Sequence, residues 1–332
     1  MVRRFSKFAV GFYGRHRPNL ALQQKLSKFK LNKSEAVAFW CDSLIIDNFK
    51  VKFRRKCDTH PAFCAFFDGR KEKNILKILV IGDVTSPAGV EHLAKNLWKF
   101  REANKIDFCV VNGENASFIT GISAPLAEKL LRCGADCITG GNHTMHNRAA
   151  YTFLDETREI LRPVNFGDSA PGRGYTILDA NGYRMLVINA MGVVHIDPVL
   201  NSPFDAIDRA LRECEGKYDF AMLDFHAEAT GEKLAIGYEY DGRINVIFGT
   251  HTHVQTADAQ ILPHGTGYIT DVGMCGESGG ILGMDAERVR LRMRSHMPHA
   301  FKAAVGPCCA DGVIFTLDTS SRKVTQIQPV SF

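Results

Sequence analysis

The sequence is constrained most by a repeated pattern of short apolar runs, each followed by glycine or a polar residue and then by a stretch with helical spacing. The run 77–81 ends at Gly82 and Asp83, and the stretch 89–104 then places apolar side chains at helical intervals. The later apolar runs are 108–111, 137–139, 220–223, 244–248, 267–270 and 312–316. Apolar runs without strict alternation, separated by helical segments, indicate an α/β fold whose sheet is covered on both faces.

The second half of the chain has more strand character than the first. Runs 175–178 and 184–188 flank Asn181-Gly182, a dipeptide typical of a tight hairpin turn. We therefore expect one α/β domain from Leu76 to the C-terminus at residue 332, built as a two-sheet sandwich flanked by helices.

The first 75 residues differ from the rest because they are basic and rich in phenylalanine. They contain 17 Lys and Arg against 6 Asp and Glu. Three interpretations are open: a targeting presequence, a basic arm that binds nucleic acid or anionic lipid, or translated upstream sequence outside the working protein. The last is favoured, because the domain pattern starts only at Leu76, and we expect segment 1–75 to be disordered or outside the functional fold.

Charge and composition narrow the classes of protein. Residues 76–332 carry 24 Lys and Arg against 30 Asp and Glu, which argues against a general nucleic-acid-binding surface on this domain. No apolar run approaches the roughly 20 residues that span a bilayer. The ten cysteines show no regular spacing, so reduced thiols are expected. These features predict a soluble, cytoplasmic protein without a membrane partner.

Carboxylate, amide and imidazole side chains follow the predicted strands. They are Asp83, Glu114, Asn115, Asn142, His143, Asp224, His226, His251 and His253. Ligand sites in α/β sheets lie beyond the carboxyl ends of the strands, so these side chains are expected to meet at one edge. Oxygen and nitrogen ligands suit iron, manganese or zinc, and the absence of cysteine argues against a structural zinc site.

Each of these residues alone has an ordinary structural interpretation. An aspartate after a strand is usually a turn or helix cap, and a lone histidine such as His226 usually lies satisfied in a core. The segment 249–253, Gly-Thr-His-Thr-His, is more specific because it brings two histidines beside a glycine. The joint occurrence of all the groups after successive strands predicts a metal centre.

Two divalent ions about 3.5–4 Å apart can hold both an attacking hydroxide and a phosphoryl oxygen. A ligand shared by both ions must be a carboxylate, and Glu114 is the best placed. His251 and His253 reach different ions if the backbone bends between them. His143 is placed to protonate the leaving oxygen. Glu228 is a candidate acceptor for a group that supports the ligands, and Lys233 and Arg243 are candidates to balance phosphate charge or to lie on the surface.

At these motifs the chain resembles the calcineurin-like metallophosphoesterases, and within them the bacterial YmdB-like branch. The matching stretches are 81–84, 112–116, 141–144, 224–230, 249–258, 269–274 and 280–285. The resemblance covers Leu76 to the C-terminus and implies a four-layer α/β/β/α sandwich of two mixed sheets. It implies one metal on Asp83, Glu114, Asn115 and His253, a second on Glu114, Asn142, His226 and His251, and His143 as proton donor.

The resemblance also implies a reaction and partners. The branch is associated with iron, alternatively manganese, with cleavage of phosphodiesters that include 2′,3′-cyclic nucleotides, and with homo-oligomers. Two departures from the wider superfamily stand out. Val84-Thr85 follows Asp83, so a histidine ligand is absent, and Thr144 replaces the acid that orients the proton donor. The second departure bears on the acid strength of His143.

Three functions follow from this pattern. The first is a phosphodiesterase or phosphatase in which a hydroxide shared by the metals attacks phosphorus. The second is a regulatory module that binds phosphate or nucleotide through its metals with little turnover. The third is a nuclease acting on RNA, which shares the chemistry of the first and differs in substrate.

Overall fold

The computed structural model describes residues 74–118 and 120–332, which belong to one compact unit, Glu72–Phe332. The expectations for segment 1–75 lie outside the described residues, except at its last two positions. Strand β1 (Ile75–Ile81) begins one residue before the predicted domain start at Leu76.

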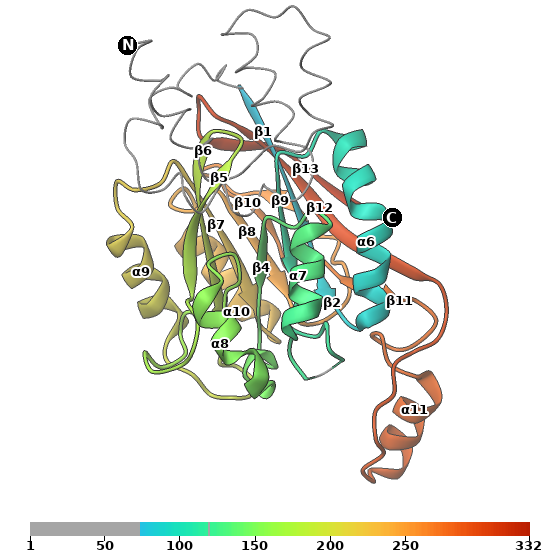
Figure 1. Ribbon diagram of the computed structural model, residues 1–332. Helices are drawn as coiled ribbons and strands as arrows, with labels where there is room; N and C mark the ends of the chain where they lie inside the picture. Colours follow the sequence, from blue (N-terminus) through green and yellow to red (C-terminus); the bar gives the residue numbers. More distant parts are fainter. Residues whose placement is uncertain (1–73, 119) are drawn as a thin grey trace, which may run out of the picture. The chain divides into compact units, whose positions relative to one another are not determined.

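The first sheet contains strands from both ends of the described chain (Figure 1). Its order is β2 (Asp83–Val84), β11 (Met274–Glu277), β12 (Cys308–Asp318), β1, β3 (Phe108–Asn112) and β4 (Cys137–Thr139), with β13 (Lys323–Ser331) also paired to β12. β1 pairs in parallel with β3 and antiparallel with β12, so the sheet is mixed.

The second sheet is assembled from the middle of the chain. Its order is β5 (Tyr175–Ala180), β6 (Tyr183–Met191), β7 (Phe220–His226), β8 (Val246–Thr250), β10 (Gly267–Ile269) and β9 (Gln260–Ile261). The predicted hairpin is confirmed, because Asn181 and Gly182 join antiparallel β5 and β6 with φ of 53° and 104°. Positive φ at both turn residues matches the twist of the flanking strands.

Helices cover the outer face of each sheet. α6 (Pro87–Asn104) and α7 (Ala124–Arg132) pack on the first sheet, whereas α9 (Pro203–Glu213) and α10 (Thr230–Glu239) pack on the second. The other helices within residues 74–118 and 120–332 are α8 (Tyr151–Glu156), α11 (Ala286–Ser295) and the single turns η1 (Thr144–His146) and η2 (Arg148–Ala150). In Figure 1, α11 projects away from both sheets.

Successive side chains of β1 point to opposite faces of the first sheet, and this alternation explains how the layers pack. Ile78 and Val80 point between the sheets, where they join a core that includes Met222 of β7. Leu79 and Ile81 point the other way, into a core formed with α6 and α7. A third core lies between the second sheet and α9 and α10. These three cores separate four layers, so the predicted α/β/β/α sandwich is confirmed.

Local sequence fixes where α6 begins, and thereby where the chain leaves the first sheet. The hydroxyl of Ser86 accepts from the backbone N–H groups of Ala88 and Gly89 over 3.1 and 3.3 Å, which caps the helix. Pro87 occupies the first turn, where its missing N–H costs nothing. The helix starts two residues before the predicted stretch 89–104, and Asp83 lies just before it.

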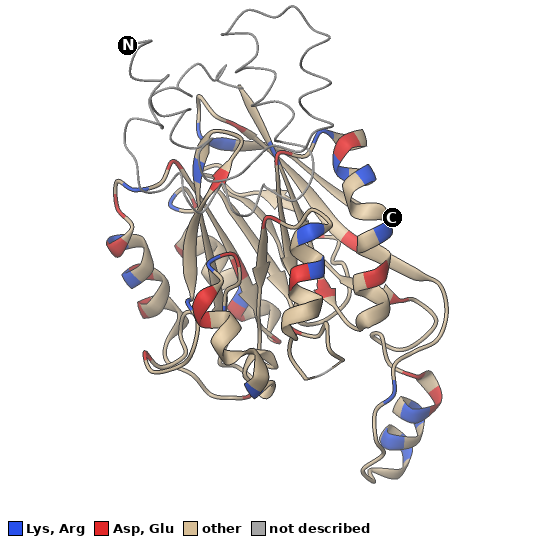
Figure 2. Cartoon of the chain, in the orientation of Figure 1, with Lys and Arg blue, Asp and Glu red and all other residues tan. Residues whose placement is uncertain are grey.

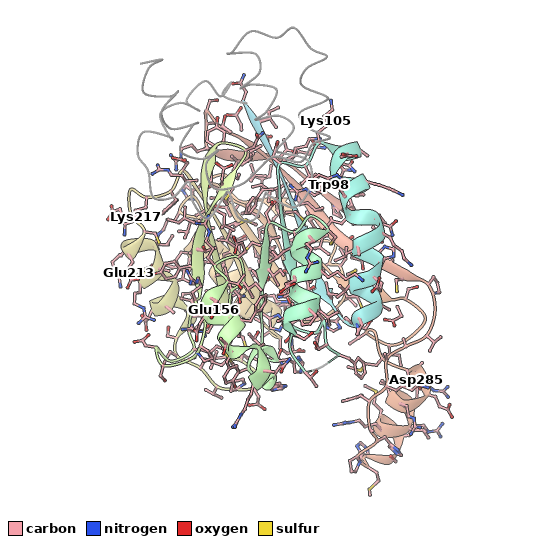
Figure 3. All side chains as sticks on the ribbon, viewed as in Figure 1. Trp98, Lys105, Glu156, Glu213, Lys217 and Asp285 are labelled. Carbon is pink, nitrogen blue, oxygen red and sulfur yellow. The ribbon has the colours of Figure 1, made fainter. Side chains whose placement is uncertain are left out.

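Charged residues lie mainly on helices and connecting segments, while the strands between them carry few (Figure 2). Trp98 lies on α6 and Glu213 on α9 (Figure 3), and the Glu213 carboxylate accepts from the hydroxyl of Tyr175 of β5. Among the described residues, every helix is too short or too polar to cross a lipid bilayer. The cysteines of this part of the chain are free thiols, as expected.

Candidate metal centre

The structure brings the seven predicted ligands and His143 together at one end of both sheets. Asp83 and Glu114 follow β1 and β3 of the first sheet, and Asn142 follows β4. His226 ends β7 of the second sheet, while His251 and His253 follow β8. The predicted runs 220–223 and 244–248 stop short of the observed strand ends, so His226 lies within its strand rather than after it.

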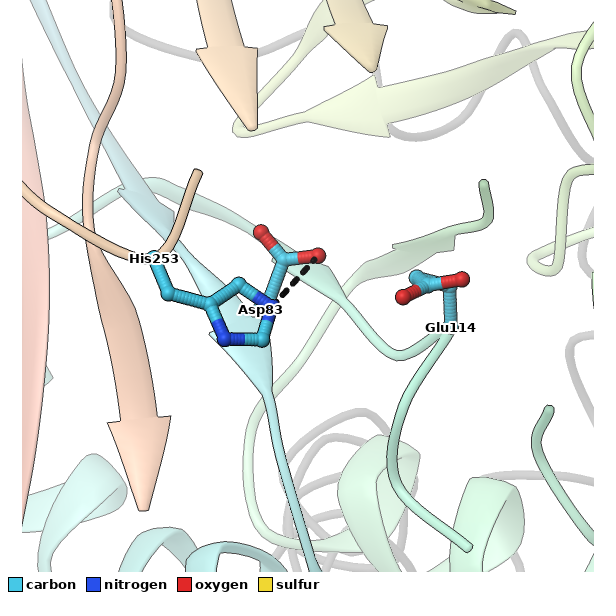
Figure 4. A group of neighbouring side chains, drawn as sticks. All are labelled: Asp83, Glu114 and His253. Atoms are coloured by element: carbon cyan, nitrogen blue, oxygen red, sulfur yellow. Dashed lines mark ion pairs between the residues drawn. The ribbon is translucent and has the colours of Figure 1, made fainter. Parts of the chain in front are cut away.

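A first group of ligand atoms surrounds Asp83. Asp83, Glu114 and His253 each offer an atom within 4.8 Å of the others (Figure 4). Nε2 of His253 lies 3.9 Å from Oδ1 of Asp83 and 3.3 Å from Nδ2 of Asn115. These four residues are the set that the resemblance implies for one ion.

A second group surrounds the buried imidazole of His226. Its Nε2 lies 2.8 Å from Oδ1 of Asn142 and 3.2 Å from Nδ1 of His251. Burial, followed by the charges of His251 and Lys233, lowers the pKa of His226 well below its ordinary value. Burial also lowers the pKa of His251, although the charge of Glu114 opposes this. Neutral imidazoles are the form that binds metals.

Hydrogen bonds connect the first group to the second group and to His143. Oδ2 of Asp83 accepts from the backbone N–H of His251 over 3.0 Å. The Glu114 carboxylate accepts from the backbone N–H of His143 over 2.7 Å, and Nδ1 of His143 lies 2.9 Å from Oε2 of Glu114. Burial alone lowers the pKa of His143, but the hydrogen bond and charge of Glu114 outweigh it and raise the pKa.

Two buried oxygen atoms indicate whether the site is suited to metal ions. Among the residues that the structure describes, Oδ1 of Asp83 and Oδ1 of Asn115 are buried with no hydrogen-bond partner. Burial, and then the charges of Glu114 and Asp271, raise the pKa of Asp83 well above its ordinary value. Unsatisfied buried acceptors and crowded carboxylates are costly in a protein interior. A cation satisfies both, so the donor set fits divalent metal ions.

The backbone bends between His251 and His253, which is the condition that their different targets require. Their φ values are 99° and 61°, in a region that residues other than glycine seldom adopt. Asp271 stabilises the bend, because its Oδ2 accepts from the backbone N–H and hydroxyl of Thr252 over 3.0 and 2.8 Å. The same oxygen accepts from Nζ of Lys233 over 2.8 Å.

The two candidates for balancing phosphate charge have other roles in the structure. Lys233 is 1% exposed and forms a buried ion pair with Asp271, so it is neither a surface residue nor a group facing the site. Arg243 pairs with Asp208 at the surface over 2.6 Å. The sequence did not reveal Lys233 as buried, because its partner lies 38 residues further along the chain.

Gly141 is required where the chain passes His226. A Cβ atom at this position would lie 2.4 Å from Nε2 of His226, which no side chain tolerates. The preceding Gly140 is held by Asn189 of β6, whose Oδ1 accepts from the Gly140 N–H over 3.0 Å. Nδ2 of Asn189 donates to the Gly140 carbonyl over 3.1 Å. The segment that carries Asn142 and His143 is thereby fixed to the second sheet.

Sequence reasoning named Asp224 among the polar residues after the strands, but it gave no role to Asp224 or to the other buried partners of the ligands. Asp224 accepts from Asn112, Thr139 and Thr250, and Thr250 also contacts His226. The period of two places Asp224 on the same face of β7 as His226, which is a signal that the sequence does contain. Glu228 was predicted to accept from a group that supports the ligands, whereas its Oε2 lies 3.2 Å from Nε2 of His251, itself a ligand candidate.

The other histidine near the site is His146. Its ring lies edge-on to the ring of His143, with centroids 5.0 Å apart. His264 pairs with Asp241 at the surface over 2.9 Å. His146 therefore borders His143, whereas His264 has its partner outside the ligand groups.

Known proteins are similar to this chain in sequence and in fold. The family of YmdB-like proteins matches residues 79–330. A 2′,3′-cyclic-nucleotide 2′-phosphodiesterase of Bacillus subtilis is 41% identical over 255 residues, which cover 77% of this chain and 96% of that protein. The crystal structure of a novel phosphatase of Mycoplasma pneumoniae has a TM-score of 0.72 at 30% identity, covering 79% of this chain and 94% of that one.

A more distant structure shares the fold alone. A putative 5′-nucleotidase of Staphylococcus aureus has a TM-score of 0.51 at 15% identity and covers 77% of this chain and 54% of that one. The matches confirm the resemblance drawn from the motifs and the expectation of a phosphoesterase enzyme. The chain belongs to the family of YmdB-like proteins.

Proposed function

We propose that the chain is a phosphodiesterase that requires two metal ions and acts on 2′,3′-cyclic nucleotides or related nucleotide phosphodiesters. The convergence of seven oxygen and nitrogen ligands in two groups, with unsatisfied oxygens on Asp83 and Asn115, carries this proposal. The activity for which the Bacillus subtilis relative is named supports the substrate class.

One ion would be held by Asp83, Glu114, Asn115 and His253, and the other by Glu114, Asn142, His226 and His251. The charge of Glu114 acts on both Asp83 and His251, which supports a place between the two ions. Iron is the expected metal and manganese the alternative, because both accept mixed oxygen and imidazole ligands. Divalent ions supply Lewis acidity that activates water and neutralises charge at phosphorus.

His143 is the proposed proton donor to the leaving oxygen. Its Nδ1 faces Glu114 over 2.9 Å, which fixes the ring and leaves Nε2 as the atom that meets substrate. The contact with Glu114 favours the protonated form that an acid needs. The ring belongs to a residue adjacent to the ligand Asn142, so substrate bound at the ions lies within its reach.

The test combines metal analysis with a substrate panel on the full-length chain. We expect about two ions per chain, turnover of 2′,3′-cyclic AMP, and loss of both ions and turnover in Glu114→Ala. Slower turnover of 3′,5′-cyclic AMP would support the substrate class. Fewer than two ions in an active preparation would refute the two-metal proposal.

The alternative of a binding module predicts a different result. It requires 2′,3′-cyclic AMP to bind at full metal occupancy without product over hours, and that outcome would replace the enzymatic proposal. RNA as substrate, a homo-oligomer and a cytoplasmic location remain predictions. Hydrolysis of a short RNA and light scattering of the purified chain measure the first two.

A further inference from the structure

A buried hydroxyl connects an acidic side chain to one of the proposed ligands. Oγ1 of Thr250 lies 2.8 Å from Oδ1 of Asp224 and 2.9 Å from Nδ1 of His226. All three residues are fully buried, so water does not compete for these contacts. Asp224 and His226 both lie on β7, and Thr250 is the last residue of the neighbouring β8.

The direction of each hydrogen bond follows from the chemistry of the groups. An ionised carboxylate only accepts, and a threonine hydroxyl has one proton to donate. Thr250 donates that proton to Asp224, and Nδ2 of Asn112 donates to the other Asp224 oxygen over 3.0 Å. The hydroxyl oxygen of Thr250 must then accept at its remaining contacts, from Nδ2 of Asn112 over 3.3 Å and from His226, so Nδ1 of His226 carries a hydrogen.

This assignment determines what His226 presents to the site. A neutral imidazole has one N–H, so Nε2 of His226 has a free electron pair. That electron pair faces Oδ1 of Asn142 at 2.8 Å and Nδ1 of His251 at 3.2 Å. Electron pairs that converge at such distances suit a cation between them.

We propose that Thr250 is a positioning residue that transmits the hydrogen bond of Asp224 to His226 and so keeps Nε2 of His226 available to a metal ion. The inference rests on the proposed function, in which His226 is a ligand. Partners of metal-binding histidines commonly fix the ring and its tautomer through the other nitrogen. Here a hydroxyl stands between the histidine and its carboxylate.

The chain contains a matched control for this role. Thr139 also donates its hydroxyl to Asp224 and is 1% exposed, but among the hydrogen bonds of the described residues its hydroxyl contacts Asp224 and not His226. Thr139→Val therefore removes a similar hydroxyl from the same carboxylate, while Thr250→Val removes the one that also contacts His226. Thr250→Ser keeps the hydroxyl and loses only a methyl group.

Metal affinity measured by calorimetry on the full-length chain is the first test. We expect Thr250→Val to weaken one of two binding events about 10–100-fold, and Thr250→Ser and Thr139→Val to remain near the wild type. Equal losses in Thr250→Val and Thr139→Val would overturn the inference, because the hydroxyl would then only support Asp224. Unchanged affinity in Thr250→Val would also overturn it.

Nitrogen NMR of the metal-free, histidine-labelled wild type is the second test and needs no variant. We expect the proton of His226 on Nδ1, and a proton on Nε2 would overturn the inference. This measurement also separates the two proposals. A wild type that binds no second ion but protonates Nδ1 would refute the two-metal function and leave the tautomer assignment standing.

Discussion

Nδ1 of His143 lies 2.9 Å from Oε2 of Glu114, and the backbone N–H of His143 donates to the same oxygen over 2.7 Å. Glu114 therefore orients the imidazole. Thr144, which occupies the position of the orienting acid in the wider superfamily, instead accepts from the backbone N–H of Gly141 over 2.7 Å. If His143 is the proton donor, as proposed, Glu114 from another strand end takes the place of the missing acid.

Substitution of His143, the proposed proton donor, should lower turnover without changing metal binding. We expect His143→Ala to lower kcat on 2′,3′-cyclic AMP by about 10²–10⁴-fold, the usual contribution of general acid catalysis. The metal content should stay at the wild-type level. The smallest loss is expected for a substrate with an acidic leaving group, such as bis-p-nitrophenyl phosphate, which needs no proton. Wild-type turnover of the cyclic nucleotide in this variant would contradict the role of His143.

The buried acid Asp83 should oppose folding when no metal is bound. Burial and then Glu114 raise its pKa well above the ordinary 3.8, so the folded metal-free chain holds a proton that the unfolded chain has released. The free energy of unfolding of that form must therefore fall as pH rises from about 4 through the raised pKa. We expect Asp83→Asn to flatten this dependence and to stabilise the metal-free chain at neutral pH by about 0.5–2 kcal/mol.

Urea unfolding of chelator-treated protein across this pH range measures the effect of Asp83→Asn. The same variant should bind metal poorly, because an amide replaces a charged ligand. A steeper pH dependence in Asp83→Asn than in the wild type would contradict the expectation.

The close packing around Gly141 predicts that adding a side chain at this position weakens metal binding. The Cβ of Gly141→Ala would lie 2.4 Å from Nε2 of His226, so the ring or the segment that carries Asn142 must move. We expect one of the two ions to be lost, as measured by metal analysis. Gly167→Ala is the control, because nothing lies within 4 Å of a Cβ there. Equal metal content in the two variants would show that the site tolerates the shift.

The ion pair between Lys233 and Asp271 should matter for stability far more than an exposed lysine. Their Nζ and Oδ2 atoms are 2.8 Å apart, and the side chains are 1% and 0% exposed. Lys233→Met leaves the Asp271 carboxylate buried without its cation, which costs about 3–5 kcal/mol. Lys217→Met, at the surface (Figure 3), should change the free energy of unfolding by less than about 0.5 kcal/mol. Similar losses in both would refute the buried role.

The sequence revealed the fold because its periodicities agree with the layers. Apolar runs such as 77–81 are buried on both faces, and the hairpin at Asn181-Gly182 is set by two residues that adopt positive φ. Strand ends were less predictable. β7 continues through Asp224 and His226, because polar contacts inside the site satisfy those side chains and allow the strand to extend beyond its apolar run.

The site was predictable where ligands share a motif, and unpredictable where a contact joins distant segments. His251 and His253 are marked by their own neighbours in sequence. By contrast, Asn112 reaches Asp224 across 112 positions, and Glu277 accepts from Ser86 across 191. Burial of Lys233 likewise depends on a partner from a later strand end. Such pairs follow from the packing of strands and leave no local pattern.

The hydrogen bond from the backbone of His251 to Asp83 crosses from one sheet of the sandwich to the other. Ligands are thus supplied by both halves, and their spacing depends on how one sheet is seated against its neighbour. Phe248 and Val80 are buried in the core between the two sheets. A bulkier or smaller side chain at either position would shift one sheet relative to the other. Remote core substitutions should therefore tune the catalytic centre without altering any residue that lines it.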